Sequence, residues 1–249
     1  MQVDHTKNII EVSNVSFSYD DQEVIKDINL TIHKGDYLGI VGSNGSGKTT
    51  LLRIILGLLP LKSGSIKLFD QDISAFKNWS KIGYVPQKVI NFDNNFPVTV
   101  EEVVTMGRYG RLGLFHKITK DDKAKVDEAL EQVEMLQYRN RQIGDLSSGQ
   151  QQRVFIARAL VGQPEIIFLD EPTVGIEKDI KEKFYKLLHD LNEKLDLTIV
   201  IITHDIESMS NEAMHVACIK DGTLIFHESL DEMFKKSHGI INKETQTYA

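Results

Sequence analysis

The chain contains few cysteine, tryptophan and proline residues: one cysteine, one tryptophan and five prolines in 249 residues. The single cysteine, Cys218, cannot form an internal disulfide, which excludes a disulfide-stabilised scaffold and fits a reducing compartment. We interpret Cys218 as a buried structural thiol. The eight histidines form no His-x-x-x-His pair, and no Cys-x-x-Cys pair exists, so we do not expect this chain to hold a metal ion through paired histidines or cysteines.

Long apolar runs and an excess of positive charge are also missing. No apolar run approaches the about 20 residues that a membrane span needs, and the polar opening MQVDHTKN does not resemble a signal peptide. The net charge of −7 argues against a broad nucleic-acid surface, because such surfaces carry a basic excess. We therefore expect a cytoplasmic protein that is neither exported nor inserted, with no nucleic-acid partner.

The composition that remains is that of an ordinary globular protein, 41% hydrophobic and 26% charged, which predicts one domain over residues 1–249. Segments 15–19 and 28–32 alternate apolar and polar residues, as antiparallel strands with one buried face do. The polar residues 20–23 lie between these two segments.

A short apolar strand at 37–41 runs into a glycine-rich loop and then into an apolar helix, which is the start of an α/β unit. Two more apolar strands, 166–169 and 198–202, end in polar residues, as parallel strands do at the functional edge of a sheet. The sequence therefore predicts an α/β fold. We expect the first helix to bury Leu51, Leu52, Ile54, Ile55 and Leu58.

Residues from about 88 to 162 have helical patterns instead of apolar strands and predict a helical insertion into the α/β core. Thr99 and Glu102 have capping-box spacing, and one helical face carries Val126, Ala129, Leu130, Val133 and Leu136. A later amphipathic helix at 182–195 would bury Phe184, Leu187, Leu188, Leu191 and Leu195. Asp221 and Gly222 predict a hairpin turn near the carboxyl end.

Residues 42–49 match G-x-x-x-x-G-K-[ST], a loop whose backbone N–H groups surround an anion at the positive end of the following helix. Lys48 would add positive charge at the β and γ phosphates of a triphosphate, and the Thr49 hydroxyl would bind Mg²⁺. A flexible glycine turn is the alternative, but it leaves the Lys-Thr ending unexplained. The expected binding residues are Gly42, Ser43, Asn44, Gly45, Ser46, Gly47, Lys48, Thr49 and Thr50.

A phosphate loop alone could belong to a kinase, a GTPase or a motor, so a second site is needed. Asp170 and Glu171 end the strand IIFLD, where the sheet edge should lie beside the glycine loop. Asp170 could bind the metal's water shell, and Glu171 could polarise an attacking water. The alternative interpretation is a solvated strand end.

Together these residues resemble the ATP-binding cassette (ABC) ATPases, with the family's motifs in order over about residues 9–235. The resemblance implies that Tyr19 stacks on adenine, although a core aromatic is the alternative. It also implies that Gln87 in GYVPQ touches the metal and the water, and that His204 in IITHD contacts the γ phosphate. The implied fold is a P-loop NTPase (RecA-like) core with an antiparallel β subdomain and an inserted α-helical subdomain.

LSSGQ at residues 146–150 resembles the family's signature sequence, which binds the γ phosphate held by the other subunit. Physical chemistry favours the same assignment, because free N–H groups at the start of the following helix attract anions. If a chain's loop and its own signature cannot face each other, two copies must pair head to tail around ATP. The signature residues are Ser147, Ser148, Gly149 and Gln150.

The chain departs from the family pattern at two positions. The family usually has glycine where this chain has Ser148, which matters only if the backbone there needs a positive φ, at a cost of about 1–2 kcal/mol. The loop after Glu171 usually ends in Leu-Asp, whereas here it ends in Ile176-Glu177. We expect activity to survive the change at Ser148, and the longer side chain of Glu177 could still bridge two subunits.

Three functions follow from the resemblance: an ATP-hydrolysing subunit of a membrane transporter, a soluble machine acting on DNA or ribosomes, and a module that binds ATP without hydrolysis. We favour the first, because the chain has no long coiled coil and no second cassette, and because Glu171 and His204 are intact. ATP and Mg²⁺ are the expected cofactors. The expected partners are a second copy of the chain and a membrane permease that holds it at the inner face of the membrane.

Four segments, IGYVPQ, FPVTVEEVVTMGRYGRLGLF, QQQRVFIARAL and DEPTVGI, look most similar to the ATPases of zinc and manganese importers. Read alone, MGRYGRLGLF could be a mobile glycine-arginine loop, and an importer of another substrate is the alternative. The resemblance implies import of zinc or manganese, with an extracytoplasmic metal-binding protein as an indirect partner.

Overall fold

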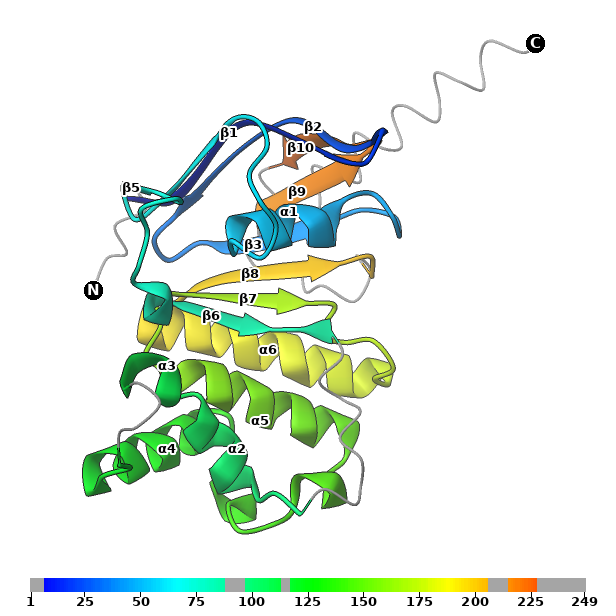
Figure 1. Ribbon diagram of the computed structural model, residues 1–249. Helices are drawn as coiled ribbons and strands as arrows, with labels where there is room; N and C mark the ends of the chain where they lie inside the picture. Colours follow the sequence, from blue (N-terminus) through cyan, green and yellow to red (C-terminus); the bar gives the residue numbers. More distant parts are fainter. Residues whose placement is uncertain (1–6, 88–96, 113–116, 206–214, 228–249) are drawn as a thin grey trace, which may run out of the picture.

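The computed structural model describes residues 7–87, 97–112, 117–205 and 215–227. Its centre is a six-stranded sheet in which β9 and β10 pair antiparallel and the other neighbouring strands pair parallel (Figure 1). In spatial order the strands are β10 (Thr223–His227), β9 (His215–Lys220), β3 (Tyr37–Val41), β8 (Thr198–Thr203), β7 (Ile166–Asp170) and β6 (Ile82–Val85).

A second, antiparallel sheet covers one face of this central sheet together with helix α1 (Lys48–Ile55). Its order is β2 (Gln22–His33), β1 (Asn8–Tyr19), β4 (Ser65–Leu68) and β5 (Gln71–Asp72). The short helix η1 (Trp79–Lys81) leads into β6. Side chains of α1 and both sheets form one apolar core.

Helices cover the other face and form a second core with the opposite side chains of the same strands (Figure 1). α6 (Lys178–Leu195) connects β7 to β8. Between β6 and β7 in the chain lie further helices: α2 (Val100–Met106), α3 (Tyr109–Leu112), α4 (Lys120–Gln132), η3 (Leu136–Tyr138), η4 (Ile143–Asp145) and α5 (Ser148–Leu160). Strands buried on both faces explain why β3, β7 and β8 read as continuous apolar runs.

The predicted α/β class and its main elements are confirmed. β1 and β2 pair antiparallel, Thr99 and Glu102 form a capping box at the start of α2, and positive φ angles at Asp221 and Gly222 make the β9–β10 turn. In the described residues no helix is long and apolar enough to cross a membrane. Residues 88–96 and 113–116 of the expected helical insertion lie outside the described part of the chain.

Four expectations of burial are wrong. Leu58 is 61% exposed, because α1 ends at Ile55 and Gly57 turns the chain at a φ of +66°. Leu136 and Leu195 are exposed, since Leu136 lies in η3 beyond the end of α4 and Leu195 is the last residue of α6. Cys218 is only half-buried; it packs against the helical core, and this burial raises the pKa of its thiol. Gln22 and Glu23, expected between strands, belong to β2.

Candidate functional site

The glycine loop joins β3 to α1, and its backbone follows a path that L side chains resist. Gly42 has a φ of +156°, and a Cβ built there would lie 2.4 Å from the carbonyl oxygen of Ile219. Gly47 has a φ of +103°, and its Cβ would lie 3.0 Å from the carbonyl oxygen of Val24. The two glycines therefore let the loop pass close to β9 and β2 before α1 begins at Lys48.

Lys48 is buried at the start of α1 and turns back over the loop. Its Nζ donates hydrogen bonds to the carbonyl oxygens of Gly42 at 2.9 Å and Ser43 at 3.0 Å, and it lies 4.0 Å from Glu171 Oε1. Burial lowers the pKa of Lys48, and the charges of Glu171 and Asp170 partly offset this effect. Two carbonyl oxygens of the loop thus hold a cation at the amino end of α1, where a bound phosphate needs positive charge.

Thr49 and Asp170 meet across the gap between the loop and β7. The Thr49 hydroxyl donates a hydrogen bond of 3.3 Å to Asp170 Oδ1, and burial raises the pKa of Asp170 while this bond lowers it. Hydroxyl and carboxylate oxygens are ligands that Mg²⁺ accepts while keeping several waters and substrate phosphates. The Thr49 and Asp170 oxygens therefore fit Mg²⁺ bound together with a nucleotide.

Glu171 follows β7 directly and is 7% exposed. Its φ is +48°, an uncommon angle for a residue other than glycine, and its backbone N–H donates to the carbonyl oxygen of Ile202. Glu171 Oε2 lies 2.8 Å from Nδ1 of His204 and accepts a 3.3 Å hydrogen bond from the hydroxyl of Thr203. The ends of β7 and β8 therefore bring the two predicted catalytic side chains together.

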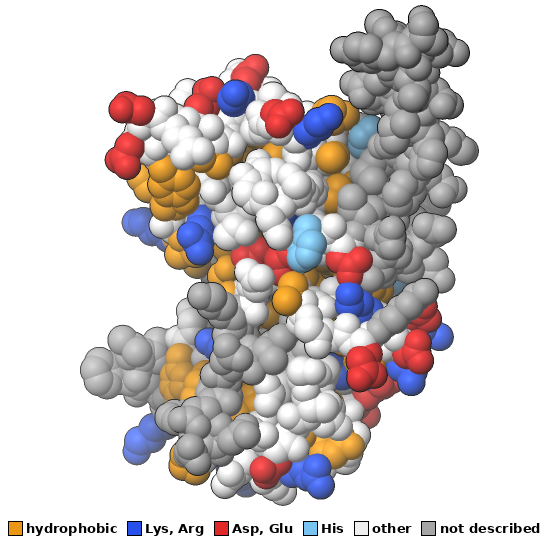
Figure 2. All heavy atoms as spheres, turned by 90° about the vertical axis from the view of Figure 1, so that its right-hand side faces the viewer, with side chains coloured by type: hydrophobic (Ala, Val, Ile, Leu, Met, Phe, Trp, Pro, Cys, Tyr) orange, Lys and Arg blue, Asp and Glu red, His pale blue; other side chains and the backbone are white. Residues whose placement is uncertain are grey.

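Figure 2 looks onto this edge of the sheet, where acidic side chains and a histidine lie next to one another near the middle of the face. Ser43, Asn44 and Gly45 of the loop are exposed, while Gly42, Thr49 and Thr50 are half-exposed. Ser46 is buried, and its hydroxyl has no hydrogen-bond partner among the described residues. A bound anion would satisfy this hydroxyl, which is a further sign that the loop fits a phosphate.

Tyr19 and Gln87 lie apart from these contacts. Tyr19 is the last residue of β1; the residue is 42% exposed, and its ring lies edge-on to that of Phe17. An exposed ring leaves one face available to a base, and the alternative of a core aromatic is wrong. Gln87 is exposed two residues beyond the end of β6.

The signature residues form the amino end of α5, away from the glycine loop. Ser147 caps the helix, and its backbone N–H donates to the side chain of Gln150, which completes a capping box. Ser148 is a helical residue without positive φ, so serine costs no backbone strain there. A neighbouring hollow of about 250 Å³ is lined by residues of the segment between α4 and α5, by the first turns of α5 and by Ile180, and not by residues of the glycine loop.

Thr203 and Lys181 belong to the site although the sequence interpretation missed them. The Thr203 hydroxyl bridges Glu171 and the backbone N–H of Asp205. Lys181 of α6 forms an ion pair with the Asp205 carboxylate, and so supports the chain next to His204. The threonine that ends the strand TIVIIT was the available signal, since polar strand ends gather at the functional edge.

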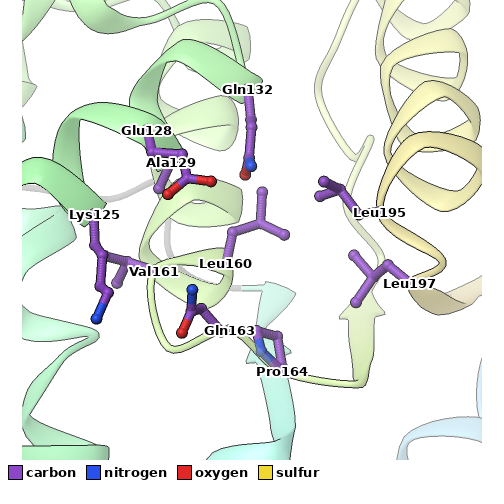
Figure 3. A pocket seen from close by; sticks show the side chains of 10 residues that line it. All are labelled: Lys125, Glu128, Ala129, Gln132, Leu160, Val161, Gln163, Pro164, Leu195 and Leu197. Atoms are coloured by element: carbon purple, nitrogen blue, oxygen red, sulfur yellow. The ribbon is translucent and has the colours of Figure 1, made fainter.

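A cavity of about 240 Å³ lies elsewhere, between α4, the carboxyl end of α5 and the end of α6 (Figure 3). Leu195 and Leu197 lie on one side of it, Glu128 and Gln132 of α4 lie on the other, and Leu160 of α5 lies between them. None of its lining residues belongs to the loop or to the strand ends that carry the candidate catalytic side chains.

Comparison with known proteins agrees with this geometry. The family model described as ABC transporter matches residues 25–174. The zinc uptake system ATP-binding protein ZurA of Listeria monocytogenes is 44% identical over 98% of this chain and 93% of its own length. The manganese transport system ATP-binding protein MntB of Bacillus subtilis is 42% identical over 80% of this chain and 78% of its own.

Among solved structures, cbiO1 from Clostridium perfringens, part of the ABC transporter complex cbiONQ, superposes with a TM-score of 0.80. It is 30% identical and covers 95% of this chain and 94% of its own. The chain belongs to the ABC transporter family and is one of its ATP-binding, ATP-hydrolysing subunits.

Proposed function

We propose that this chain is the ATPase of an importer of zinc or manganese, acting as a single domain over residues 1–249. Two copies would enclose ATP head to tail and attach to a membrane permease at the inner face of the membrane. The single observation that carries the hydrolytic role is Glu171, held between Lys48 and His204 at the edge of the sheet. The names of the relatives, zinc and manganese transport ATPases, support the cargo.

The residues of one protomer would divide the work on ATP among them. Tyr19 would stack on the base, residues 42–50 would hold the phosphates, and Thr49, Asp170 and Gln87 would hold Mg²⁺. The metal would neutralise charge between the β and γ phosphates when bound. Glu171 would orient the attacking water, and His204 would contact the γ phosphate.

The partner subunit would complete the site. Ser147 of the partner subunit and its neighbours would meet the γ phosphate with free N–H groups at the amino end of α5. Support comes from the placement of α1 and α5 on opposite faces of the central sheet, and no loop residue lines the hollow at the signature. Val174 and Ile180 are 44% and 41% exposed, which suits burial between two copies.

A groove of about 340 Å³ suits the permease. It is lined by residues of η1, β6, the α2–α3 segment and the end of α5: Trp79, Ser80, Ile82, Gly83, Tyr84, Met106, Gly107, Gly110, Arg111, Arg158, Ala159 and Gly162. None of these residues is acidic and two are arginines. We infer that it receives an amphipathic permease helix with an apolar face and at least one carboxylate. Gln87 does not line this groove, and residues 88–96 lie outside the described part of the chain.

The cargo is tested in cells. We expect a strain carrying Lys48→Ala to grow poorly in chelator-limited medium and to contain less zinc, because Lys48 serves only ATP. Lys186→Ala, at an exposed position on α6, is the matched control. Rescue by zinc supports zinc import, rescue by manganese alone selects manganese, and unchanged cellular content of both metals by mass spectrometry contradicts the proposal. An effect on DNA or ribosome functions without a metal defect would favour a soluble ABC ATPase.

A further inference from the structure

The segment Met106–Arg111 contributes no residue to the nucleotide site, yet it packs closely against α5. Gly107 follows α2, and a Cβ built on it would lie 2.0 Å from the carbonyl oxygen of Arg158 and 2.7 Å from the side chain of Val161. No other residue could occupy position 107 without moving one helix. The end of α2 therefore lies directly on the carboxyl end of α5.

Arg108 strengthens the same junction. It is 3% exposed, and its Nη1 donates a 3.1 Å hydrogen bond to the carbonyl oxygen of Val161. Its Nε and Nη2 donate to Asp122 Oδ1 at 3.0 Å and 2.8 Å. One buried guanidinium thus joins the α2–α3 turn to the end of α5 and to the first turn of α4.

Asp122 is fixed on its other side too. Its Oδ2 accepts hydrogen bonds from the backbone N–H and the hydroxyl of Thr119, at 2.9 Å and 2.7 Å. These bonds and the Arg108 guanidinium hold the pKa of Asp122 well below its usual range. With both oxygens occupied, the ion pair has one geometry and leaves little freedom for relative motion.

Helix α5 has two functional ends. Its carboxyl end supplies Arg158 and Ala159 to the proposed permease groove, and its amino end carries Ser147 and Ser148. A helix of this length spans about 20 Å as a stiff rod. A displacement of the groove wall that is fastened to α5 must therefore move the signature.

We propose that Gly107 and Arg108 are positioning residues that fasten the groove to α5 and so couple the groove to the signature. The inference rests on the proposed function, because it assumes that ATP binds between two copies. A purely structural role would be shared by Arg139, which pairs with Glu101 and Asp127 in the same helical region. Within the described residues the guanidinium of Arg139 bonds to Glu101 and Asp127 and not to α5, so it provides a matched control.

Trp79 gives the measurement, since it is the only tryptophan of the chain and lines the groove. Coupling is reciprocal, so closing the dimer at the signature must alter the groove. We would record Trp79 emission against protein concentration at saturating Mg²⁺ and a non-hydrolysable ATP analogue, with light scattering to follow dimers. Trp79 also packs on Gly57 beyond α1, so nucleotide binding to a single chain can change its emission directly. The signal is therefore the part of the emission change that follows the concentration of dimer.

The test variant is Arg108→Met/Asp122→Asn, which removes both charges and keeps an acceptor for Thr119. It should dimerise with nucleotide while losing the dimer-dependent Trp79 signal, whereas Arg139→Met/Glu101→Gln should keep it. Gly107→Ala offers a second variant should the first fail to fold by circular dichroism. An unchanged signal in the Arg108 variant, or an equal loss in the Arg139 control, overturns the inference. A wild-type chain that never dimerises overturns the proposed function instead, and the inference with it.

Discussion

His204 Nδ1 lies 2.8 Å from Glu171 Oε2, although the two residues come from different strand ends. The other carboxylate oxygen of Glu171 lies 4.0 Å from Lys48 Nζ. The carboxylate is therefore held between two groups that would each contact the γ phosphate. This arrangement places the acid that we propose to orient water beside the glycine loop.

Glu171→Gln should bind ATP without cleaving it, because the amide keeps the shape of the side chain and loses its charge. We expect phosphate release to fall by about 10²–10⁴-fold, the usual contribution of a positioned base. Light scattering should then show a lasting ATP-dependent dimer. Hydrolysis at the wild-type rate would contradict the role assigned to Glu171.

Arg158→Glu should weaken attachment to the permease, because it reverses a charge in a groove whose described lining has no carboxylate. Cross-linking would use a cysteine at Tyr109, which is 38% exposed on α3, in a Cys218→Ser background. The cross-link to a membrane subunit should fall at least about tenfold, the equivalent of 1.4 kcal/mol.

Lys186→Glu is the matched control for that experiment, since it makes the same charge reversal at an exposed position on α6. It should leave the cross-link unchanged. Equal losses in both variants would show a general charge effect and not a docking groove. Cross-links only to nucleic acid or ribosomal protein would refute the importer.

Stability at acid pH should depend on the buried Arg108–Asp122 pair. The Thr119 hydrogen bonds and the Arg108 guanidinium hold the folded pKa of Asp122 below its unfolded value. The ionised carboxylate therefore stabilises the fold above the unfolded pKa of about 3.9, and this effect is lost as pH falls from there toward the folded pKa. In urea titrations from pH 7 to 3, the stability difference between wild type and Arg108→Met/Asp122→Asn should therefore shift in favour of the variant as pH falls. Arg158→Ala should run parallel to wild type, and parallel curves for the double variant would contradict the assignment.

Much of the fold could be predicted because its signals are local. The glycine loop, the apolar strands with polar ends and the Thr99–Glu102 cap are each determined by a few residues that are close together in the sequence. The strand order of the central sheet then brings Asp170, Glu171 and His204 to the edge beside Lys48. Parallel strands end at a common edge, so this meeting followed from the pattern.

The rest depended on contacts between distant residues. Nothing in the sequence near Arg108 indicates Asp122 or the Val161 carbonyl, and nothing near Gly107 indicates the Arg158 backbone. Leu58 and Leu136 were wrongly predicted for a related reason, since apolar periodicity continues past the residue at which the chain leaves the helix, and Leu195 is exposed because α6 ends there. Helix ends are decided by turns and caps, which apolar spacing does not encode.

Mixing two defective chains tests the ATP sandwich most directly. Lys48→Ala damages the loop, while Ser148→Glu puts a negative charge at the exposed start of α5, which the helix tolerates and a partner's phosphate does not. Each variant alone has two damaged sites per dimer, but a mixed dimer has one intact site. Phosphate release from an equal mixture should rise to about a quarter of the wild-type rate, as random pairing in a symmetric dimer requires. If each variant alone is inactive and the mixture forms mixed dimers without any gain in phosphate release, each ATP is not shared between a loop and the partner's signature.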